Sequence, residues 1–489
     1  MQSEPPYGSI EEPSSRNIPW FWLGIFSIFL LSAGLRFWGL SQFNTLVFDE
    51  VHFAQFANNY LIRKTFFENH PPLGKYFIAI GIWLTQGIPG ESNTLAGSAL
   101  TPFSYRWMNA LVGSFIPLII AGIAYQLSKR RSYTLIAGFL AALDGLFLVE
   151  SRYALINVYL VMFGLLGQWL FLLALERSPK QQNIFITLAG ICFGASFAVK
   201  WNGLAFLLSV YLLWIAAKII DFLQTRWQTQ TEVNSLIDNH PKTTLQKLAK
   251  LRLIDIVSEL GIVPLIIYIL VWIPHLQLNT EMNFWQWQKY LYQSQNSVGA
   301  DAHPYCSRWY TWLLMLRPVG YYFQSVKNPN PSLNQVAETY YDVHAIGNPI
   351  LWWLSTGAIT VIIGLFIQKF IILTSNLVTN ERKILLVRDH KFWIVLYLLA
   401  NYIANLLPWI SVTRCTFLYH YMGASVFSLL AIAWLIERCL RSPHLVYQLT
   451  TAFMIFFIVI SFLFWLPIYL GFPLSPIEFQ SRMWFRSWY

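Results

Sequence analysis

Two adjacent carboxylates, Asp49 and Glu50, stand in the run F-D-E-V-H-F at residues 48–53, just after an apolar segment. Ionised carboxylates near a bilayer are costly unless a wet cavity, a cationic partner or a function retains them. Neighbouring residues of a helix do not share a face, so we expect the two acids to have different roles, one facing a substrate and one anchoring the loop. Helix capping with ion pairing to Arg63 or Lys64 explains the pair equally well.

A lysine and an arginine stand at the ends of apolar segments, where they are suited to bind a phosphate. Lys200 is the one cation of a long apolar neighbourhood, and Arg152 lies at the end of another apolar run. A lysine at the headgroup level suits a lipid-linked phosphate, although snorkelling to the interface explains it as well. Asp144 lies deep in an apolar run, which favours hydrogen bonding between helices.

A later segment combines aromatic rings with cations. It reads H-P-Y-C-S-R-W at residues 303–309, so that His303 is followed by Arg308 and then by Arg317. Aromatic rings and arginines bind sugars and phosphates through stacking and bidentate hydrogen bonds. Aromatic residues also form the interfacial belts of ordinary membrane proteins, so the rings alone do not decide the function.

The elements that must position these residues are membrane helices. The chain has 489 residues, of which 56% are hydrophobic and 11% charged, and its mean hydropathy is +0.47. A soluble domain carries roughly 25% charged residues. Repeated apolar stretches predict an all-α integral membrane protein, because backbone groups in lipid must be satisfied within helices and no barrel pattern is present. We predict about eleven spans, at 19–40, 105–127, 133–150, 154–175, 183–199, 202–221, 254–274, 349–372, 391–410, 419–437 and 447–470. The stretch 76–86 is too short and is predicted to be interfacial or re-entrant.

The charge distribution predicts the orientation. The net charge is +10, and the cations cluster in short loops between apolar segments, which is the orientation signal of membrane proteins and disfavours nucleic acid as a partner. With a cytoplasmic N-terminus, the basic loops near residues 129–131, 177–180, 226–252, 382–391 and 438–441 all face the cytoplasm. The polar start of the chain is unlike a cleaved signal peptide, so 19–40 is expected to be a retained helix. The basic segment 221–253 is expected to be a solvated loop rather than an amphipathic surface helix.

This topology divides the chain into a cytoplasmic tail (1–18), an N-terminal transmembrane module (19–274) with a catalytic external loop (41–104), a second external loop (275–348) and a C-terminal transmembrane module (349–489). It also gathers the unusual polar residues on the external face, which predicts a site at that membrane–water boundary. These residues are Asp49, Glu50, His70, Arg152, Lys200, His303, Arg317, Arg414 and His420. Cys306 and Cys415 fall on the same, oxidising side, where a disulfide between them is permitted but not required.

Several motifs resemble those of the protein O-mannosyltransferase family. They are the F-D-E-V-H-F run with H-P-P-L-G-K at 70–75, D-G-L at 144–146 with S-R at 151–152, V-K-W-N-G-L at 199–204, H-P-Y at 303–305 with R-P-V at 317–319, I-G-N-P at 346–349 and F-L-Y-H-Y at 417–421. The resemblance extends over about residues 20–470.

The resemblance implies a GT-C glycosyltransferase fold in the plasma membrane, with the active site on the external face. It implies inverting transfer of mannose from a polyprenyl phosphate to Ser or Thr hydroxyls of translocated proteins, which makes the secretion machinery a candidate partner. Asp49 would be the catalytic base and Glu50 its partner in the loop. Candidates for binding the donor phosphate or substrate are Lys200, Arg152, His70, Lys75, Arg106, His303, Arg317, Arg414 and His420. The sequence shows no required cofactor and leaves metal dependence open.

The chain departs from the family pattern at four points. Asn157 stands where relatives have an aspartate, Trp312 is followed by two leucines where W-P-L is usual, and Asn109 falls near a usual arginine, which leaves Arg106 as its substitute. The β-trefoil insert of eukaryotic members is missing from the 275–348 loop.

Two other functions remain open. A GT-C enzyme of this kind could use a lipid or glycan acceptor, as aminoarabinose transferases do. A transporter is the second alternative, but it would place ionisable residues near mid-membrane and broken helices in matching halves, neither of which this sequence shows.

Overall fold

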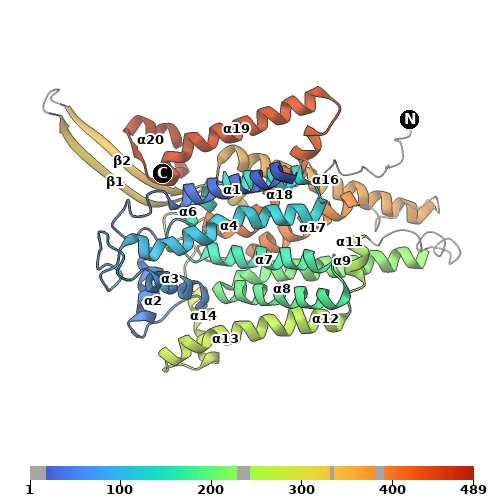
Figure 1. Ribbon diagram of the computed structural model, residues 1–489, viewed down its shortest axis with the longest axis horizontal. Coiled ribbons are helices and arrows are strands. Elements are labelled where there is room, and N and C mark those ends of the chain that lie inside the picture. The colour runs from blue at the N-terminus through green and yellow to red at the C-terminus, as the bar shows by residue number, and fades with distance from the viewer. Residues whose placement is uncertain (1–17, 228–242, 331–334, 380–389) are drawn as a thin grey trace.

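The fold is a bundle of long helices. The computed structural model describes residues 18–227, 243–330, 335–379 and 390–489. Among these residues, ten helices are long and apolar enough to cross a membrane, and Figure 1 shows them lying side by side along one direction. They are α1 (Ile18–Phe37), α4 (Pro102–Ser128), α7 (Asn157–Ala174), α8 (Pro179–Val199), α9 (Leu204–Trp227), α12 and α13 (Leu253–Val257 and Val263–Leu278, joined by a π-helical turn), α16 (Pro349–Thr379), α17 (His390–Leu406), α18 (Met422–Leu440) and α19 (Leu445–Leu470). The predicted all-α membrane fold is confirmed.

The predicted span 133–150 is wrong as a single helix. It forms two helices, α5 (Arg131–Ala142) and α6 (Gly145–Glu150), which are separated at Leu143 and Asp144. Asp144 adopts an extended conformation at the N-cap of α6, where its Oδ1 accepts a hydrogen bond from the Phe147 N–H at 2.9 Å. A capping carboxylate satisfies a backbone donor that a continuous helix would bond internally, so the helix restarts at this residue. Asp144 therefore caps a helix, in contrast to the helix–helix hydrogen bond predicted for it.

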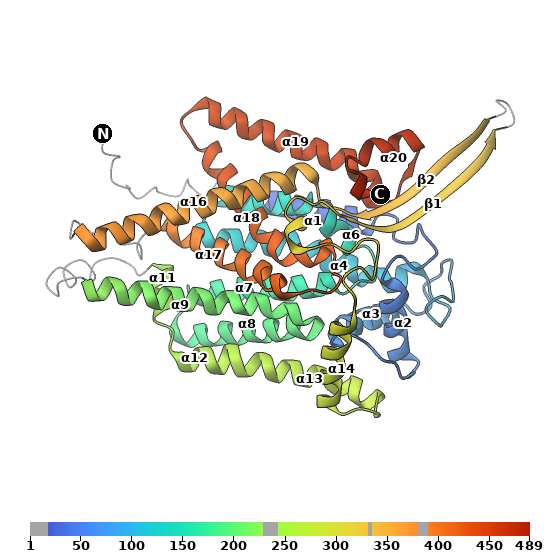
Figure 2. The same cartoon turned by 180° about the vertical axis from the view of Figure 1, so that it is seen from behind.

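One end of the bundle carries the short elements (Figures 1 and 2). The helix α3 covers most of the apolar stretch predicted not to span, and its 12 residues are too few to cross a bilayer. The short helices are α2 (Glu50–Leu61), α3 (Leu73–Leu84), α14 (Phe284–Ser297), α15 (Trp309–Trp312) and α20 (Pro476–Arg482), with the 3-10 helices η2 (Trp201–Gly203), η5 (Leu407–Ser411), η6 (Leu418–Tyr421) and η7 (Arg486–Trp488); α11 (Thr244–Ala249) lies at the other end.

The same end also carries an antiparallel sheet that the sequence analysis did not predict. It consists of β1 (Val319–Asn330), β2 (Gln335–Ala345) and β3 (Pro473–Leu474), in the order β1-β2-β3. The register pairs Val319 with Ala345 and shifts between Gly320 and Tyr322. Such a bulge leaves one residue unpaired and redirects its side chain, and here that residue is Tyr321. Figure 1 shows the hairpin extending away from the bundle beside α20.

Polar side chains connect the helices inside the bundle. Gln168 of α7 donates a hydrogen bond to Ser209 of α9 at 2.8 Å and accepts one from Tyr397 of α17 at 2.9 Å. Ser209 in turn donates to Asn401 of α17 at 2.7 Å. Because lipid offers no alternative partners, hydrogen bonds of this kind hold membrane helices together. They fix α7, α9 and α17 relative to one another, and these helices lead directly to the site.

Candidate active site

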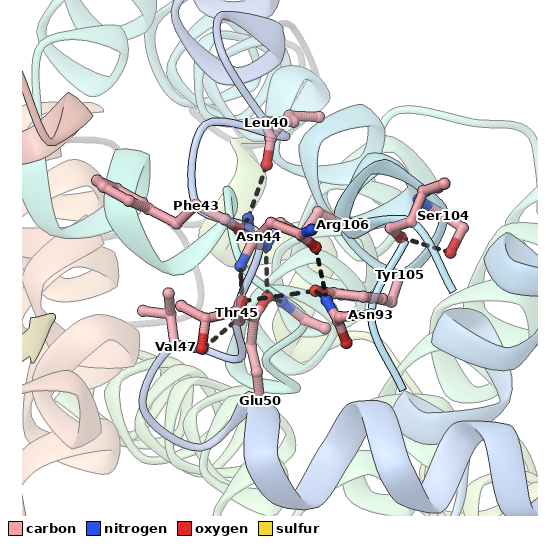
Figure 3. Close-up of polar contacts among 12 residues, drawn as sticks. Leu40, Phe43, Asn44, Thr45, Val47, Glu50, Asn93, Ser104, Tyr105 and Arg106 are labelled. Carbon is pink, nitrogen blue, oxygen red and sulfur yellow. Dashed lines mark hydrogen bonds and ion pairs between the residues drawn. The ribbon is translucent and has the colours of Figure 1, made fainter. Parts of the chain in front are cut away.

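A buried ion pair fixes the loop that carries the two acids (Figure 3). The Glu50 side chain is fully buried and receives two hydrogen bonds from the Arg106 guanidinium, at 2.7 and 2.9 Å. Its two oxygens also accept the backbone N–H groups of Val47 at 2.8 Å and Ala154 at 2.7 Å. Glu50 is therefore saturated with donors, and it anchors the loop as one of the two acids was predicted to do.

The hydrogen-bond donors of Arg106 are likewise all occupied. Besides Glu50, its guanidinium donates to the backbone carbonyls of Leu40, Phe43 and Thr45 at 2.7–3.0 Å (Figure 3). A guanidinium has five N–H donors, and these contacts use all five. Arg106 has no donor left for a phosphate, so it acts as a positioning residue, in contrast to the substrate-binding role predicted for it.

Asp49 is the acid that remains available. It is half-buried at the N-cap of α2, yet its carboxylate forms no hydrogen bond with any residue that the structure describes. Burial raises the pKa of this carboxyl, against the opposing charges of Lys200 and His52. A desolvated carboxylate without a partner is a usual property of a catalytic base.

The residue before Asp49 is strained. Phe48 has a φ of 50°, a left-handed conformation that costs a residue with a side chain about 1–3 kcal/mol. Its ring stacks on Tyr321 with centroids 4.4 Å apart and planes 9° apart, and lies edge-on to His303 and Tyr419. These contacts hold the backbone in the conformation that sets the direction of Asp49.

Lys200 lies between α8 and η2 as the cation of the site. Its side chain is buried, its Nζ donates to Asn157 Oδ1 at 2.8 Å, and it lies 5.3 Å from the centre of the Tyr419 ring. Burial lowers the pKa of this ammonium to about 8, although the carboxylates of Asp49 and Glu150 act in the opposite direction. In the part of the chain that the structure describes, Lys200 forms no ion pair with a carboxylate.

Glu150 and Tyr321 complete this network, and neither of them was predicted to belong to the site. Asn157 donates from its amide nitrogen to Glu150 Oε2 at 3.1 Å, and the Tyr321 hydroxyl donates to Glu150 Oε1. Glu150 is fully buried at the end of α6. The position of Glu150, an acid at the end of an apolar run, could have predicted its place in the site. Tyr321 reaches the site because of a β-bulge, which no local sequence pattern predicts.

A polar cavity of about 620 Å³ opens beside Lys200. Of the predicted residues, His70, Lys200, Arg414 and His420 line it, and Arg308 adds a further cation. Burial lowers the pKa of His70 well below its usual range, so this imidazole is neutral at physiological pH. The ring of His420 packs against those of Trp312 and Trp409, with centroids 6.0 and 4.6 Å away.

An apolar groove of about 460 Å³ adjoins the polar cavity. The two share Trp201, Asn202, Trp409 and Val412, and the groove continues along α9 over leucine side chains such as Leu204 and Leu208. Leu204 and Leu208 are exposed on the outside of the bundle, where lipid would lie. The combined space therefore suits a ligand with a charged head and a long apolar tail.

Seven predicted residues do not line this cavity, namely Asp49, Glu50 and Arg106 described above, and Arg152, Lys75, His303 and Arg317. Arg152 donates from Nη1 to the last carbonyls of α1 and beyond, at Leu35, Arg36 and Trp38. Lys75 is buried and donates to the His70 carbonyl at 2.9 Å, with Glu68 at 3.5 Å. Both side chains position backbone rather than ligand in this structure, in contrast to the prediction. His303 and Arg317 belong to the adjoining loop, where Arg317 donates to the Pro304 carbonyl at 2.9 Å.

A disulfide links Cys306 to Cys415, 109 positions apart in the chain. It joins the loop of His303 to the segment that carries Arg414, so it connects two walls of the site. Among the described residues, no group of three or more His, Cys, Asp or Glu side chains could hold a metal ion.

Comparisons with known proteins identify the family of this chain. The model of the family described as dolichyl-phosphate-mannose-protein mannosyltransferase matches residues 26–280, and that of the C-terminal four TMM region of protein-O-mannosyltransferase matches residues 281–488. The polyprenol-phosphate-mannose–protein mannosyltransferases of Mycolicibacterium smegmatis and Corynebacterium glutamicum are 23% and 24% identical, over 94% and 95% of this chain and 91% and 92% of theirs.

The fold is also shared with a solved structure. The Saccharomyces cerevisiae protein O-mannosyltransferase Pmt1-Pmt2 complex bound to the sugar donor matches with a TM-score of 0.74 at 16% identity, covering 96% of this chain and 92% of that one. The predicted GT-C architecture is confirmed. The chain belongs to the dolichyl-phosphate-mannose-protein mannosyltransferase family.

Proposed function

We propose that this enzyme transfers mannose from a polyprenyl-phosphate-mannose donor to Ser or Thr hydroxyls of translocated proteins, at the cavity beside Lys200. The observation that carries the proposal is the junction of a cationic cavity with an apolar groove. The curated relatives are named for a polyprenol-phosphate-mannose donor. A charged head next to a membrane-facing groove is the shape that such a lipid requires.

In this arrangement the donor phosphate lies between Lys200 and Arg414. Both line the polar cavity, and Arg414 is half-buried and belongs to the segment between η5 and η6. The polyprenyl chain follows the groove along α9, where it replaces membrane lipid against Leu204 and Leu208. Charge-assisted hydrogen bonds to phosphate are roughly twice as strong as neutral ones, so the two cations would supply most of the headgroup affinity.

The reaction is a single displacement. The acceptor oxygen forms a bond to the anomeric carbon while the bond from that carbon to the phosphate oxygen breaks, and the acceptor proton moves to the Asp49 carboxylate. The leaving polyprenyl phosphate gains one negative charge, which Lys200 and Arg414 stabilise. Attack opposite to the leaving group inverts the configuration at the anomeric carbon. Glu50 takes no part in proton transfer and keeps Asp49 in place.

The same proposal places the site on the external face of the plasma membrane. Two observations support this orientation. Of the basic loops predicted for the cytoplasm, those near residues 129–131, 177–180 and 438–441 lie at the end of the bundle away from the site, and the disulfide at the site end belongs to an oxidising compartment. A polypeptide emerging from the secretion machinery would meet the site on that face.

The test is an Asp49→Asn substitution. Asparagine keeps the size of the side chain and removes the base, so transfer of labelled mannose from the lipid donor to membrane proteins should fall by a factor of about 100 or more. Glu91→Gln is the matched control, because Glu91 is an exposed acid of the same external loop. Both variants should accumulate in membranes at the level of the parent enzyme. Undiminished transfer by Asp49→Asn would remove Asp49 from the mechanism.

A further inference from the structure

A second charged cavity lies at the opposite end of the bundle from the active site. It measures about 690 Å³ and is bounded by the start of α5 and by parts of α16, α17 and α18. Its charged lining includes Arg130, Lys369, Lys391, Glu437, Arg438 and Arg441. These residues come from four separate places in the chain, so the cavity is built by the packing of helices and not by a single basic loop.

The arginines of this cavity outnumber its acid. Glu437 is buried, and its Oε1 lies 3.3 Å from Arg441 and 3.6 Å from Arg130, while it also accepts a hydrogen bond from Ser132 at 3.1 Å. Three arginines less one carboxylate leave a net charge of +2 on these groups alone. Like charges around one cavity repel one another unless an anion enters.

Arg438 is the arginine best placed to receive that anion. It forms no ion pair with any residue in the described part of the chain, and its guanidinium lies 4.8 Å from the centre of the Trp434 ring. Stacking on an indole orients a guanidinium while it leaves the N–H donors free for a planar or tetrahedral oxyanion.

An apolar surface of α16 faces outward near the cavity. Val361, Ile363 and Ile367 of α16 are 40–50% exposed on the outside of the bundle, and Lys369, two residues after Ile367 and on another face of the same helix, lines the cavity. A soluble phosphate would make no use of such a surface. A phospholipid would place its acyl chains along α16 and its headgroup between the arginines.

We propose that this cavity binds the headgroup of an anionic glycerophospholipid in the leaflet opposite the active site. Basic pockets between membrane helices on the cytoplasmic side are the usual sites for such headgroups. Cations that only set topology need not converge, because their position within a loop is unimportant for that role. The ligand class follows from the net positive charge and the adjacent apolar face, independently of the transfer reaction.

The experiment is lipid binding by the full-length purified protein, measured by native mass spectrometry with phosphatidylglycerol and with phosphatidylcholine. The parent protein should retain phosphatidylglycerol in preference. Arg438→Gln with Arg441→Gln should weaken that retention about 30-fold, from the loss of two cations at the membrane surface. Arg177→Gln with Lys180→Gln is the matched control, because it removes two exposed cations at the same end that do not line the cavity, and retention should be unchanged.

Two further arms decide the identity of the ligand and the folding of the variants. Arg438→Lys keeps the charge and should retain phosphatidylglycerol within a few-fold of the parent, which separates lost charge from a damaged fold. Inorganic phosphate should not displace the lipid. Equal retention of both lipids by the parent, equal loss in the control pair, or displacement by inorganic phosphate would each overturn the proposal.

Discussion

Lys200 should give the enzyme an alkaline limit close to physiological pH. Its pKa is lowered to about 8 by burial, whereas most lysines remain charged to above pH 10. In the proposed site, only the protonated ammonium could hold the donor phosphate. As pH rises through the pKa, the ammonium loses its proton, so donor capture weakens at high pH and is intact below about pH 7.

The magnitude follows from the titration of one group. With a pKa of about 8, roughly nine-tenths of Lys200 is charged at pH 7 and about one-tenth at pH 9, so kcat/KM should fall about tenfold between them. Asp49 supplies the acid limb, because the base must be ionised and burial raises its pKa above that of an exposed aspartate. The profile of kcat/KM should therefore be bell-shaped. A bound phosphate favours the charged lysine, so the alkaline limb of kcat should lie at higher pH.

The assay is transfer of labelled mannose to an acceptor peptide at limiting donor, measured over about pH 5–10 in reconstituted vesicles. Lys200→Arg is the informative variant, because a guanidinium stays charged throughout that range. It should lose the alkaline limb and keep the acid limb, even where its changed geometry lowers the maximum. The same alkaline limb in the Lys200→Arg enzyme, or a flat parent profile up to pH 10, would refute the assignment.

Three other substitutions test the supports of the site. Arg106→Leu should lower the free energy of unfolding by about 3–5 kcal/mol, because Glu50 would be left buried without its partner. Adding Glu50→Gln to that variant should recover part of the loss, as measured by thermal unfolding. Cys306→Ser, or a reductant, should lower the unfolding midpoint and reduce transfer together, since the bridge joins two walls of the cavity. Asn157→Asp should move the alkaline limb to higher pH and raise the KM for the donor, because a carboxylate next to Lys200 raises the pKa of its ammonium and competes with the phosphate.

Hydropathy and loop charge were sufficient to predict the helical bundle. Apolar windows located the ten long helices, because a membrane span needs a length and composition that few other structures require. They failed at residues 133–150, where a single capping carboxylate at Asp144 interrupts an apolar run without changing its hydropathy much. They also missed the sheet, because windows chosen for membrane spans do not detect the short β1–β2 hairpin, and because β3 pairs with β2 across more than 120 positions.

The sequence predicted which residues lie near the candidate site, but only some of their contacts. Asp49 and Lys200 lie within mutual electrostatic influence, as their shared external placement suggested. Arg106, Arg152 and Lys75 are instead occupied by backbone carbonyls of neighbouring segments. A sequence pattern fixes which end of the molecule a cation occupies. Whether its donors meet a ligand or a carbonyl depends on how the loops fold over it.

The two hydrogen bonds of the Asn157 side chain give a physical reason for an amide at this position. Its Oδ1 accepts from the Lys200 ammonium, and its nitrogen donates to Glu150. An amide can accept from a cation and donate to an anion at once, whereas an aspartate at 157 would set two carboxylates against each other. Glu150 therefore acts on Lys200 as a nearby negative charge, with the Asn157 amide between the two side chains. The charge of Glu150 acts on Lys200 although the two side chains are not bonded to each other. To bind the donor phosphate, the Lys200 ammonium would therefore give up one hydrogen bond to a neutral acceptor, which costs less than breaking a buried ion pair.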